Sequence, residues 1–284
     1  MKELSLLEQL CFSTTRIETE DSKGTKYTGT GFFFNLHIEG KIMPIVITNK
    51  HVVSGMVKGL FRLTMENKEG NPNYTNHFTI NYEVDFDKMW VFHPDANVDL
   101  CVLPFNMLVE AAKTMGHVLF FRAFENYMIL NQNNLQDLDA IEDVLMIGYP
   151  NGLWDEVNNM PIIRKGITAT DPKLNYNGKK EFLIDAACFP GSSGSPVIIC
   201  NKGGYVDKKG TFNVGNIRLI FLGILYAAPQ LNVTGEIQIV TIPTLQQRLL
   251  SISQIPNNLG YVIKSERILD FIPILKQKYS LECL

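Results

Sequence analysis

The chain has 284 residues, of which 45% are hydrophobic and 19% are charged, a balance typical of folded globular proteins. Its 26 Lys and Arg against 29 Asp and Glu give a formal net charge of -3. A weakly acidic chain lacks the basic field on which nucleic-acid binding depends, so we expect no nucleic-acid partner. The length suits one large domain or two smaller halves that share a core.

The N-terminal residues and the spacing of the cysteines indicate in which cellular compartment the protein is expected. Glu3 and Glu8 interrupt the apolar residues of the first segment, so it lacks the pattern of an export signal. No stretch approaches the roughly 18 apolar residues of a membrane span. The cysteines are scattered without a C-x-x-C pair, which argues against a disulfide framework and a zinc site: Cys11, Cys101, Cys188, Cys200 and Cys283. We therefore expect free thiols, no metal or cofactor, no membrane association and a cytoplasmic location.

Short β-branched and aromatic runs separated by turn residues dominate the first half. A helical pattern covers Ser5–Leu10. The runs that follow predict strands over Phe12–Glu18, Gly31–Ile38, Ile42–Thr48, Leu60–Met65, His77–Tyr82 and Leu100–Leu103. A second helix is expected over Met107–Met115 and a strand over Val118–Phe121, and the polar stretch Asn131–Asp139 is the best candidate for a linker.

The second half continues the pattern. Strands are predicted over Val144–Gly148, Ile162–Thr168, Phe182–Ala186, Ser195–Ile199 and Leu219–Tyr226. The stretch Asn201–Asn216 is typical of a surface loop or long hairpin, and a helix over Glu266–Ile272 follows Ser265 as its expected N-cap. A dozen short strands at this spacing predict an all-β fold, either a sandwich or a barrel.

Three segments carry the residue types of nucleophilic catalysis. His51 follows an apolar strand, Asp99 stands at the mouth of another, and Ser193 lies in the glycine-flanked turn Pro190–Pro196. A serine hydroxyl is a poor nucleophile unless a base such as histidine lies beside it, and that histidine needs a carboxylate to fix its tautomer. A glycine-rich turn can supply backbone N–H groups to an oxyanion. Together the three segments predict a His51, Asp99 and Ser193 triad.

The order of these residues excludes other hydrolases. All five histidines precede residue 118: His37, His51, His77, His93 and His117. An α/β-hydrolase needs its histidine after the serine, which excludes that fold with Ser193 as nucleophile. A subtilisin order could use Asp21, but the short strands do not suit its parallel sheet. The sequence has no H-E-x-x-H or P-loop pattern.

The chain resembles trypsin-like serine peptidases, and among them most closely the bacterial Htr-type branch. The resemblance spans roughly residues 12 to 272 and is carried by the motifs Gly29–Phe32, Ile47–Val53, Val98–Leu100, Ile147–Gly152, Asp185–Pro196, Leu222–Ile224 and Gly260–Lys264. It implies two six-stranded antiparallel β-barrels with the active site between them and a C-terminal helix packed back across the molecule. Residues 1–130 would carry His51 and Asp99, and residues 131–284 would carry Ser193 and end in the helix. No segment resembling a PDZ domain follows.

The resemblance also assigns roles. His51 becomes the general base, Asp99 its orienting carboxylate and Ser193 the nucleophile of a serine endopeptidase that cleaves proteins or peptides. The N–H groups of Gly191 and Ser193 become the oxyanion hole. The strand that pairs with the substrate falls on Tyr226, Ala227 and Ala228, and the floor of the S1 pocket falls on Ala187, which implies a small or medium apolar P1 residue.

Two departures from the family pattern affect activity. Ser195 stands where a glycine is usual, which is tolerable if its φ is not strongly positive. Ser192 replaces the carboxylate that pairs with a newly freed N-terminus in zymogens, so we expect no such activation. The turn's own hydrogen bonds, neighbouring loops, a protein partner or an oligomer would order it instead. Two alternatives stay open: a protease-like binding module without activity, and a cysteine nucleophile at Cys188.

Overall fold

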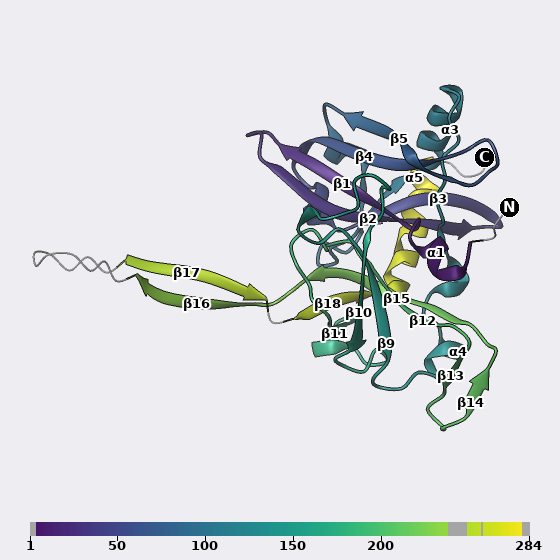
Figure 1. Cartoon of the computed structure of the whole chain (residues 1–284), viewed down its shortest axis with the longest axis vertical. Helices are drawn as coiled ribbons and strands as arrows, with labels where there is room; N and C mark the ends of the chain where they lie inside the picture. Colours follow the sequence, from purple (N-terminus) through teal and green to yellow (C-terminus); the bar gives the residue numbers. More distant parts are fainter. Residues whose placement is uncertain (1–3, 238–248, 257, 280–284) are drawn as a thin grey trace, which may run out of the picture.

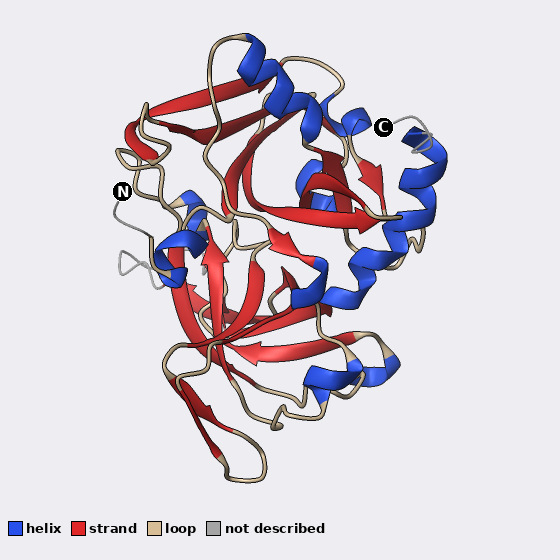
Figure 2. Cartoon of the chain, turned by 90° about the vertical axis from the view of Figure 1, so that its right-hand side faces the viewer, coloured by secondary structure: helices blue, strands red, loops and turns tan. Residues whose placement is uncertain are grey.

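A computed structural model describes residues 4–237, 249–256 and 258–279. Strands dominate both halves of the molecule, and the helices lie at its edges (Figures 1 and 2). The all-β, trypsin-like fold predicted from the sequence is confirmed. The expected boundary between residues 130 and 131 stays a prediction.

The first half is built on one eight-stranded sheet of order β5-β4-β1-β2-β3-β7-β6, with β8 beside β2. Its strands are β1 (Thr14–Asp21), β2 (Lys26–Ile38), β3 (Lys41–Thr48), β4 (Met56–Glu66), β5 (Pro72–Tyr82), β6 (Val91–Phe92), β7 (Cys101–Pro104) and β8 (Phe124–Glu125). Its helices are α1 (Leu6–Leu10), α2 (Lys50–Val53), α3 (Asn106–Thr114) and the 3-10 turns η1 (Phe86–Met89) and η2 (Asn126–Met128). The six-stranded barrel expected for this half is not found: among the described residues the sheet has eight strands, and no ladder joins β5 to the two-residue β6.

The second half is a closed six-stranded barrel of order β10-β11-β18-β15-β12-β9, as expected. Its strands are β9 (Asp143–Gly148), β10 (Ile162–Thr168), β11 (Glu181–Asp185), β12 (Pro196–Asn201), β15 (Arg218–Ala227) and β18 (Leu259–Lys264). Short helices accompany it: α4 (Gln132–Leu135), η3 (Pro150–Gly152), η4 (Tyr176–Gly178), η5 (Ser265–Phe271) and α5 (Ile272–Tyr279).

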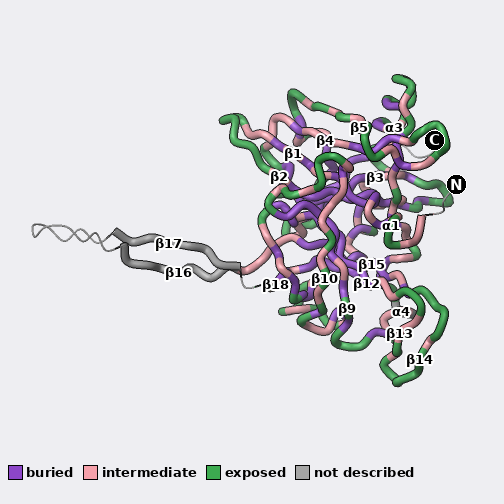
Figure 3. Tube along the Cα trace, in the orientation of Figure 1, coloured by how far each residue is buried: buried purple, intermediate pink, exposed green. Residues whose placement is uncertain are grey.

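Two hairpins extend from this barrel. The predicted loop or hairpin after β12 forms β13 (Gly204–Val206) and β14 (Phe212–Val214), which Figure 3 shows as a largely exposed tip. The second hairpin, β16 (Gln230–Ile237) and β17 (Leu249–Pro256), projects far from the body directly after the end of β15 (Figure 1).

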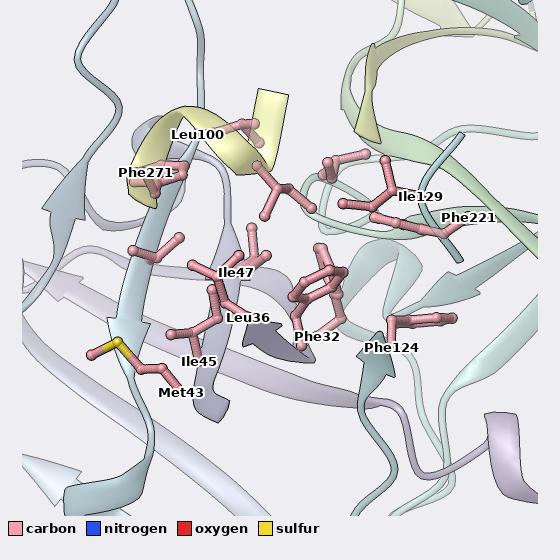
Figure 4. Packing of buried hydrophobic residues seen from close by; sticks show 14 of the residues in the cluster. Phe32, Leu36, Met43, Ile45, Ile47, Leu100, Phe124, Ile129, Phe221 and Phe271 are labelled. Carbon is pink, nitrogen blue, oxygen red and sulfur yellow. The ribbon is translucent and has the colours of Figure 1, made fainter. Parts of the chain in front are cut away.

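A large apolar core fills the space between the two halves. Strand β2 is buried on both faces, so successive side chains enter different clusters: Phe32 packs toward the second half, while Phe33 packs within the first. The Phe32 ring lies 5.3 Å from the ring of Phe221 on β15, and Phe221 stacks on Phe124 at 5.1 Å (Figure 4). This contact fixes the first sheet against the barrel and so sets the relative position of the segments that carry His51 and Ser193.

The C-terminal helices pack across both halves, as expected. Phe271 is fully buried in the shared core. Glu266 forms an ion pair with Lys180 of the second half at 2.9 Å, and the Asp270 carboxylate lies within hydrogen-bonding distance, 3.1 Å, of His93 Nε2 in the first half. The N-cap prediction at Ser265 is wrong, because Ser265 lies inside η5 and its hydroxyl accepts the Leu130 N–H.

Two further segments differ from prediction. Val118–Phe121 is not a ladder strand: Leu119 makes one isolated bridge to Met65, because β4 shifts register between Thr64 and Met65 while it pairs with β5. The expected linker Asn131–Asp139 contains α4 and the fully buried Leu138, so part of it packs into the second half.

Candidate active site

His51 and Asp99 are brought together by the register of two neighbouring strands. Strand β3 ends at Thr48, and Thr48 pairs with Cys101 at the start of β7. Because the two strands run antiparallel, the residues after Thr48 pass the residues before Cys101. The chain then turns into the single-turn helix α2, which presents His51.

Three hydrogen bonds fix this pair. His51 Nδ1 and Asp99 Oδ2 lie 2.5 Å apart, and the His51 backbone N–H donates to Asp99 Oδ1 at 3.1 Å. The side-chain amide of Asn49 donates to the Asp99 carbonyl at 2.7 Å. Asp99 is shielded while the imidazole is half exposed, with side-chain exposures of 23% and 50%. The carboxylate therefore holds the ring by Nδ1 and leaves Nε2 without a hydrogen bond to any of the described residues.

The turn that carries Ser193 packs against the strands leading to His51. The Thr30 N–H donates to the Ser193 carbonyl at 2.9 Å. Gly194 lies so close to Thr30 and Thr48 that an added Cβ would meet their oxygens at 1.9 and 2.6 Å. Ser193 itself is partly exposed, and its hydroxyl forms no hydrogen bond to any residue in the described part of the chain. Hydrogen bonds between nucleophile and base are often long in the absence of substrate.

Two peptide planes in this turn are held at their carbonyls and leave their N–H groups without an acceptor among the described residues. The Pro190 carbonyl accepts the Asn151 N–H at 2.5 Å, and the Ser192 carbonyl accepts the Ser195 N–H at 3.0 Å. In a planar trans peptide the N–H points opposite to the carbonyl. The following N–H groups, those of Gly191 and Ser193, therefore point the other way, and they donate to no acceptor within residues 4–237, 249–256 and 258–279. Two free donors in one turn can bind an oxyanion.

Ser195 fits because a glycine faces it. An added Cβ at Gly148 would lie 2.0 Å from the Ser195 hydroxyl, so only glycine there leaves the space that this hydroxyl occupies. The φ of Ser195 is not positive, which meets the condition set by its replacement of glycine.

Replacement of Gly194 by alanine is expected to destabilise the fold strongly. Gly194 has φ +88, and its Cβ would collide with the Thr30 carbonyl. Gly24 has nearly the same φ, +82, but nothing lies within 4 Å of its Cβ. We expect Gly24→Ala to cost about 1 kcal/mol and Gly194→Ala at least about 3 kcal/mol of unfolding free energy in urea titrations. Equal losses would contradict the close packing of the turn on β2.

The comparison with known families agrees with this fold. A family model described as trypsin-like peptidase domain matches residues 29–206, more than half of the chain. The chain belongs to the trypsin-like peptidase family. No curated protein sequence matched it.

Solved structures similar to this trypsin-like peptidase are distant in sequence. The MamO protease domain of Magnetospirillum magneticum is 13% identical, with a TM-score of 0.43 over 93% of this chain and 97% of that one. The active form of the Rv3671c protease of M. tuberculosis is 14% identical, with a TM-score of 0.42 over 91% and 78%. A mutant of the tobacco etch virus protease is 12% identical, with a TM-score of 0.45 over 96% and 82%.

The residues expected to bind substrate lie along the end of β15 and beside the turn that carries Ser193. The Gly194 N–H donates to the Leu225 carbonyl at 2.9 Å, which joins the turn to the strand just before Tyr226. Ala187, Ala227 and Ala228 are all partly buried. The Tyr226 hydroxyl donates to Glu181 at 2.9 Å, and burial together with this bond raises the pKa of the phenol far above its usual range.

Cys188 does not have the properties of a nucleophile. It is 2% exposed, and burial raises the pKa of its thiol to about 11, so it is protonated at neutral pH. Cys11, Cys101, Cys188 and Cys200 are free thiols, and Cys283 lies outside the described residues. Across the described ranges no cluster of three His, Cys, Asp or Glu could hold a metal, and no helix there is long and apolar enough to cross a bilayer.

Sequence reasoning missed the residues that support the turn. Thr30 lies in the motif Gly29–Phe32 and Asn151 in the motif Ile147–Gly152, but the motifs alone predict no contact between these residues and the turn. For Asn151 the signal was available: Asn-Gly is typical of two successive left-handed residues, and here Asn151 and Gly152 have φ 52 and 69. For Thr30, flanked by glycines on both sides, no local signal points to a partner more than 100 residues away.

Proposed function

We propose that this protein is a serine endopeptidase of the Htr-type branch, in which His51, Asp99 and Ser193 form the catalytic triad. The observation that carries the proposal is the 2.5 Å contact between His51 Nδ1 and Asp99 Oδ2. In neutral histidine, the nitrogen bonded to a carboxylate carries the proton, which leaves Nε2 as the acceptor. A serine hydroxyl becomes a nucleophile when a base accepts its proton, and the free lone pair on Nε2 is suited to that.

In this mechanism, Ser193 Oγ attacks the carbonyl carbon of the scissile peptide while its proton passes to His51 Nε2. The carbonyl oxygen becomes an oxyanion and accepts the Gly191 and Ser193 N–H groups. When the C–N bond breaks, His51 returns the proton to the leaving amine and an acyl ester remains on Ser193. Water, activated by the same histidine, hydrolyses the ester.

A serine-directed fluorophosphonate tests the proposal. We expect the wild-type protein to be labelled on Ser193, located by mass spectrometry of the tryptic peptide, and Ser193→Ala and His51→Ala to remain unlabelled. Ser192→Ala is the matched control, because the Ser192 hydroxyl is buried and has no partner in the part of the chain described here. Equal labelling of Ser193→Ala would refute the nucleophile. Absence of both labelling and hydrolysis in the wild type would favour the alternative of a protease-like binding module.

The S1 pocket is expected to select small or medium apolar P1 residues. Ala187 at the proposed floor and Ala227 and Ala228 at the proposed walls carry no charge that could pair with Arg or Lys. Mass spectrometry of cleavage products from a proteome-derived peptide library would measure the preference, with Ser193→Ala as background control. Strict cleavage after Arg or Lys would contradict the assignment of Ala187.

The biological setting of the proposed peptidase is a regulated or processing role in the cytoplasm. The four free thiols of the described residues support a reducing compartment. Its proposed partners are protein or peptide substrates, with an activating protein or a second copy of the chain as a further partner. Comparison of activity at several protein concentrations, with and without cell extract, would detect either kind of activation.

A further inference from the structure

Thr30 occupies a central position between the two halves, and every polar group it has is engaged. The residue is fully buried. Its hydroxyl donates to the Gly191 carbonyl at 2.9 Å and accepts the Tyr149 N–H at 3.1 Å and the Ser195 hydroxyl at 3.4 Å. Its backbone N–H donates to the Ser193 carbonyl, and its carbonyl accepts the Thr48 hydroxyl at 2.7 Å. One side chain thus uses its single donor and both lone pairs on the segments around the nucleophile.

The Thr30 hydroxyl binds the carbonyl of the middle peptide plane of the turn, whose N–H group, that of Ser192, donates to the Phe189 carbonyl at 3.0 Å. The planes 190–191 and 192–193 are held at their carbonyls by Asn151 and Ser195, whereas the plane between them is bonded at its carbonyl by Thr30. If that middle plane rotates, the φ of Ser192 and the ψ of Gly191 change, and the directions of the two flanking N–H groups change relative to each other. The Thr30 hydroxyl therefore restrains this plane at its carbonyl, as the Phe189 carbonyl does at its N–H, and so helps to set the directions of the Gly191 and Ser193 N–H groups.

Two other features of the structure are consistent with Thr30 as the residue that orders the turn around Ser193. Ser192, next to the nucleophile, is 1% exposed, neutral and without a side-chain hydrogen bond among the described residues, so it does not tether the turn by charge pairing. Gly148 leaves the space needed for the hydroxyl, because a Cβ there would lie 2.7 Å from Thr30 Oγ1.

We propose that Thr30 is a positioning residue whose hydroxyl, supplied by the first half of the molecule, keeps the oxyanion turn of the second half assembled without an activating N-terminus. The inference rests on the proposed peptidase function. It adds the prediction that the turn is preformed by a neutral hydrogen bond between the halves.

The test compares Thr30→Val, which removes only the hydroxyl and keeps the shape, with Thr30→Ser, which keeps the hydroxyl. We expect Thr30→Val to lower kcat about 10- to 100-fold and to leave KM within about 2-fold of wild type. The loss of kcat should be smaller than the roughly 10²–10³-fold loss caused by removing a direct oxyanion donor. Thr30→Ser should restore kcat to within about 3-fold of wild type. Thr15→Val is the matched control: Thr15 is 1% exposed and its hydroxyl donates to the Arg62 carbonyl, away from the turn.

A second readout does not depend on activity. Hydrogen–deuterium exchange of a peptide spanning residues 189–194 should be faster in Thr30→Val and unchanged in Thr30→Ser and Thr15→Val. If Thr30→Val had the kcat and the hydrogen–deuterium exchange rate of the wild type, the inference would be overturned. Equal losses of kcat in Thr30→Val and Thr15→Val would overturn it too. If Ser193→Ala were as active as wild type, the proposed function would fail, and the exchange comparison would still decide whether Thr30 orders the turn.

Discussion

Ser193→Ala and His51→Ala are each expected to lower kcat for a cleavable peptide by about 10⁵- to 10⁶-fold, and the double variant is expected to be no less active than either single one. The reason is that nucleophile and base act as one unit: without His51 the Ser193 hydroxyl keeps its proton, and without Ser193 the imidazole has no group to activate. The free Gly191 and Ser193 N–H groups should leave a small residual rate above that in water.

The measurement is single-turnover hydrolysis of a peptide found in the cleavage library, with circular dichroism to show that each variant is folded. His37→Ala is the matched control for loss of a histidine, because His37 pairs with Glu125 at the far end of β2. His37→Ala should retain wild-type kcat. Additive losses in the double variant, or an active His51→Ala protein, would contradict the triad.

Asp99→Asn is expected to lower kcat by about 10⁴-fold while leaving the fold intact. The asparagine side chain has nearly the same shape and can still accept the His51 backbone N–H, which lies 3.1 Å from Oδ1. Its NH₂ group, however, would donate to His51 Nδ1 and so favour the tautomer with the proton on Nε2. That tautomer cannot accept the Ser193 proton.

The matched control for this variant is Asp143→Asn, which removes the same charge from a surface pair with Lys165, 2.7 Å apart, in the barrel of the second half. We expect its kcat to stay within about 2-fold of wild type, because exposed pairs contribute little. A loss of less than about 10-fold in Asp99→Asn would show that the 2.5 Å contact to His51 does not set the tautomer.

The chemistry of the candidate site could be derived from the sequence because it depends on residue types and their order. A histidine after an apolar strand, a carboxylate before another and a serine between glycines are local features, and their order excluded the α/β-hydrolases. Most strands were also predictable, since alternation with a period of two is a property of short stretches. The predictions for β9 and β10 differ from the structure by at most one residue at an end.

Segments whose structure depends on distant partners were not predictable in this way. Val118–Phe121 has a strand-like composition, but it meets β4 where the register of that strand shifts. Ser265 has the residue type of an N-cap, but its hydroxyl binds the Leu130 N–H, 135 residues away in sequence. In both cases a tertiary contact outweighed local propensity.

The sequence by itself determined which side chains could act, and the tertiary structure decided how they are held. The pairing of Thr48 with Cys101 brings His51 to Asp99, and no local pattern specifies that register. Likewise, the Thr30 hydroxyl reaches the Gly191 carbonyl across 161 residues. The physical reason is that strand register and the contacts between the halves, such as that of Phe32 with Phe221, depend on residues far apart in the chain, whereas a sequence pattern reports only the preferences of neighbouring residues.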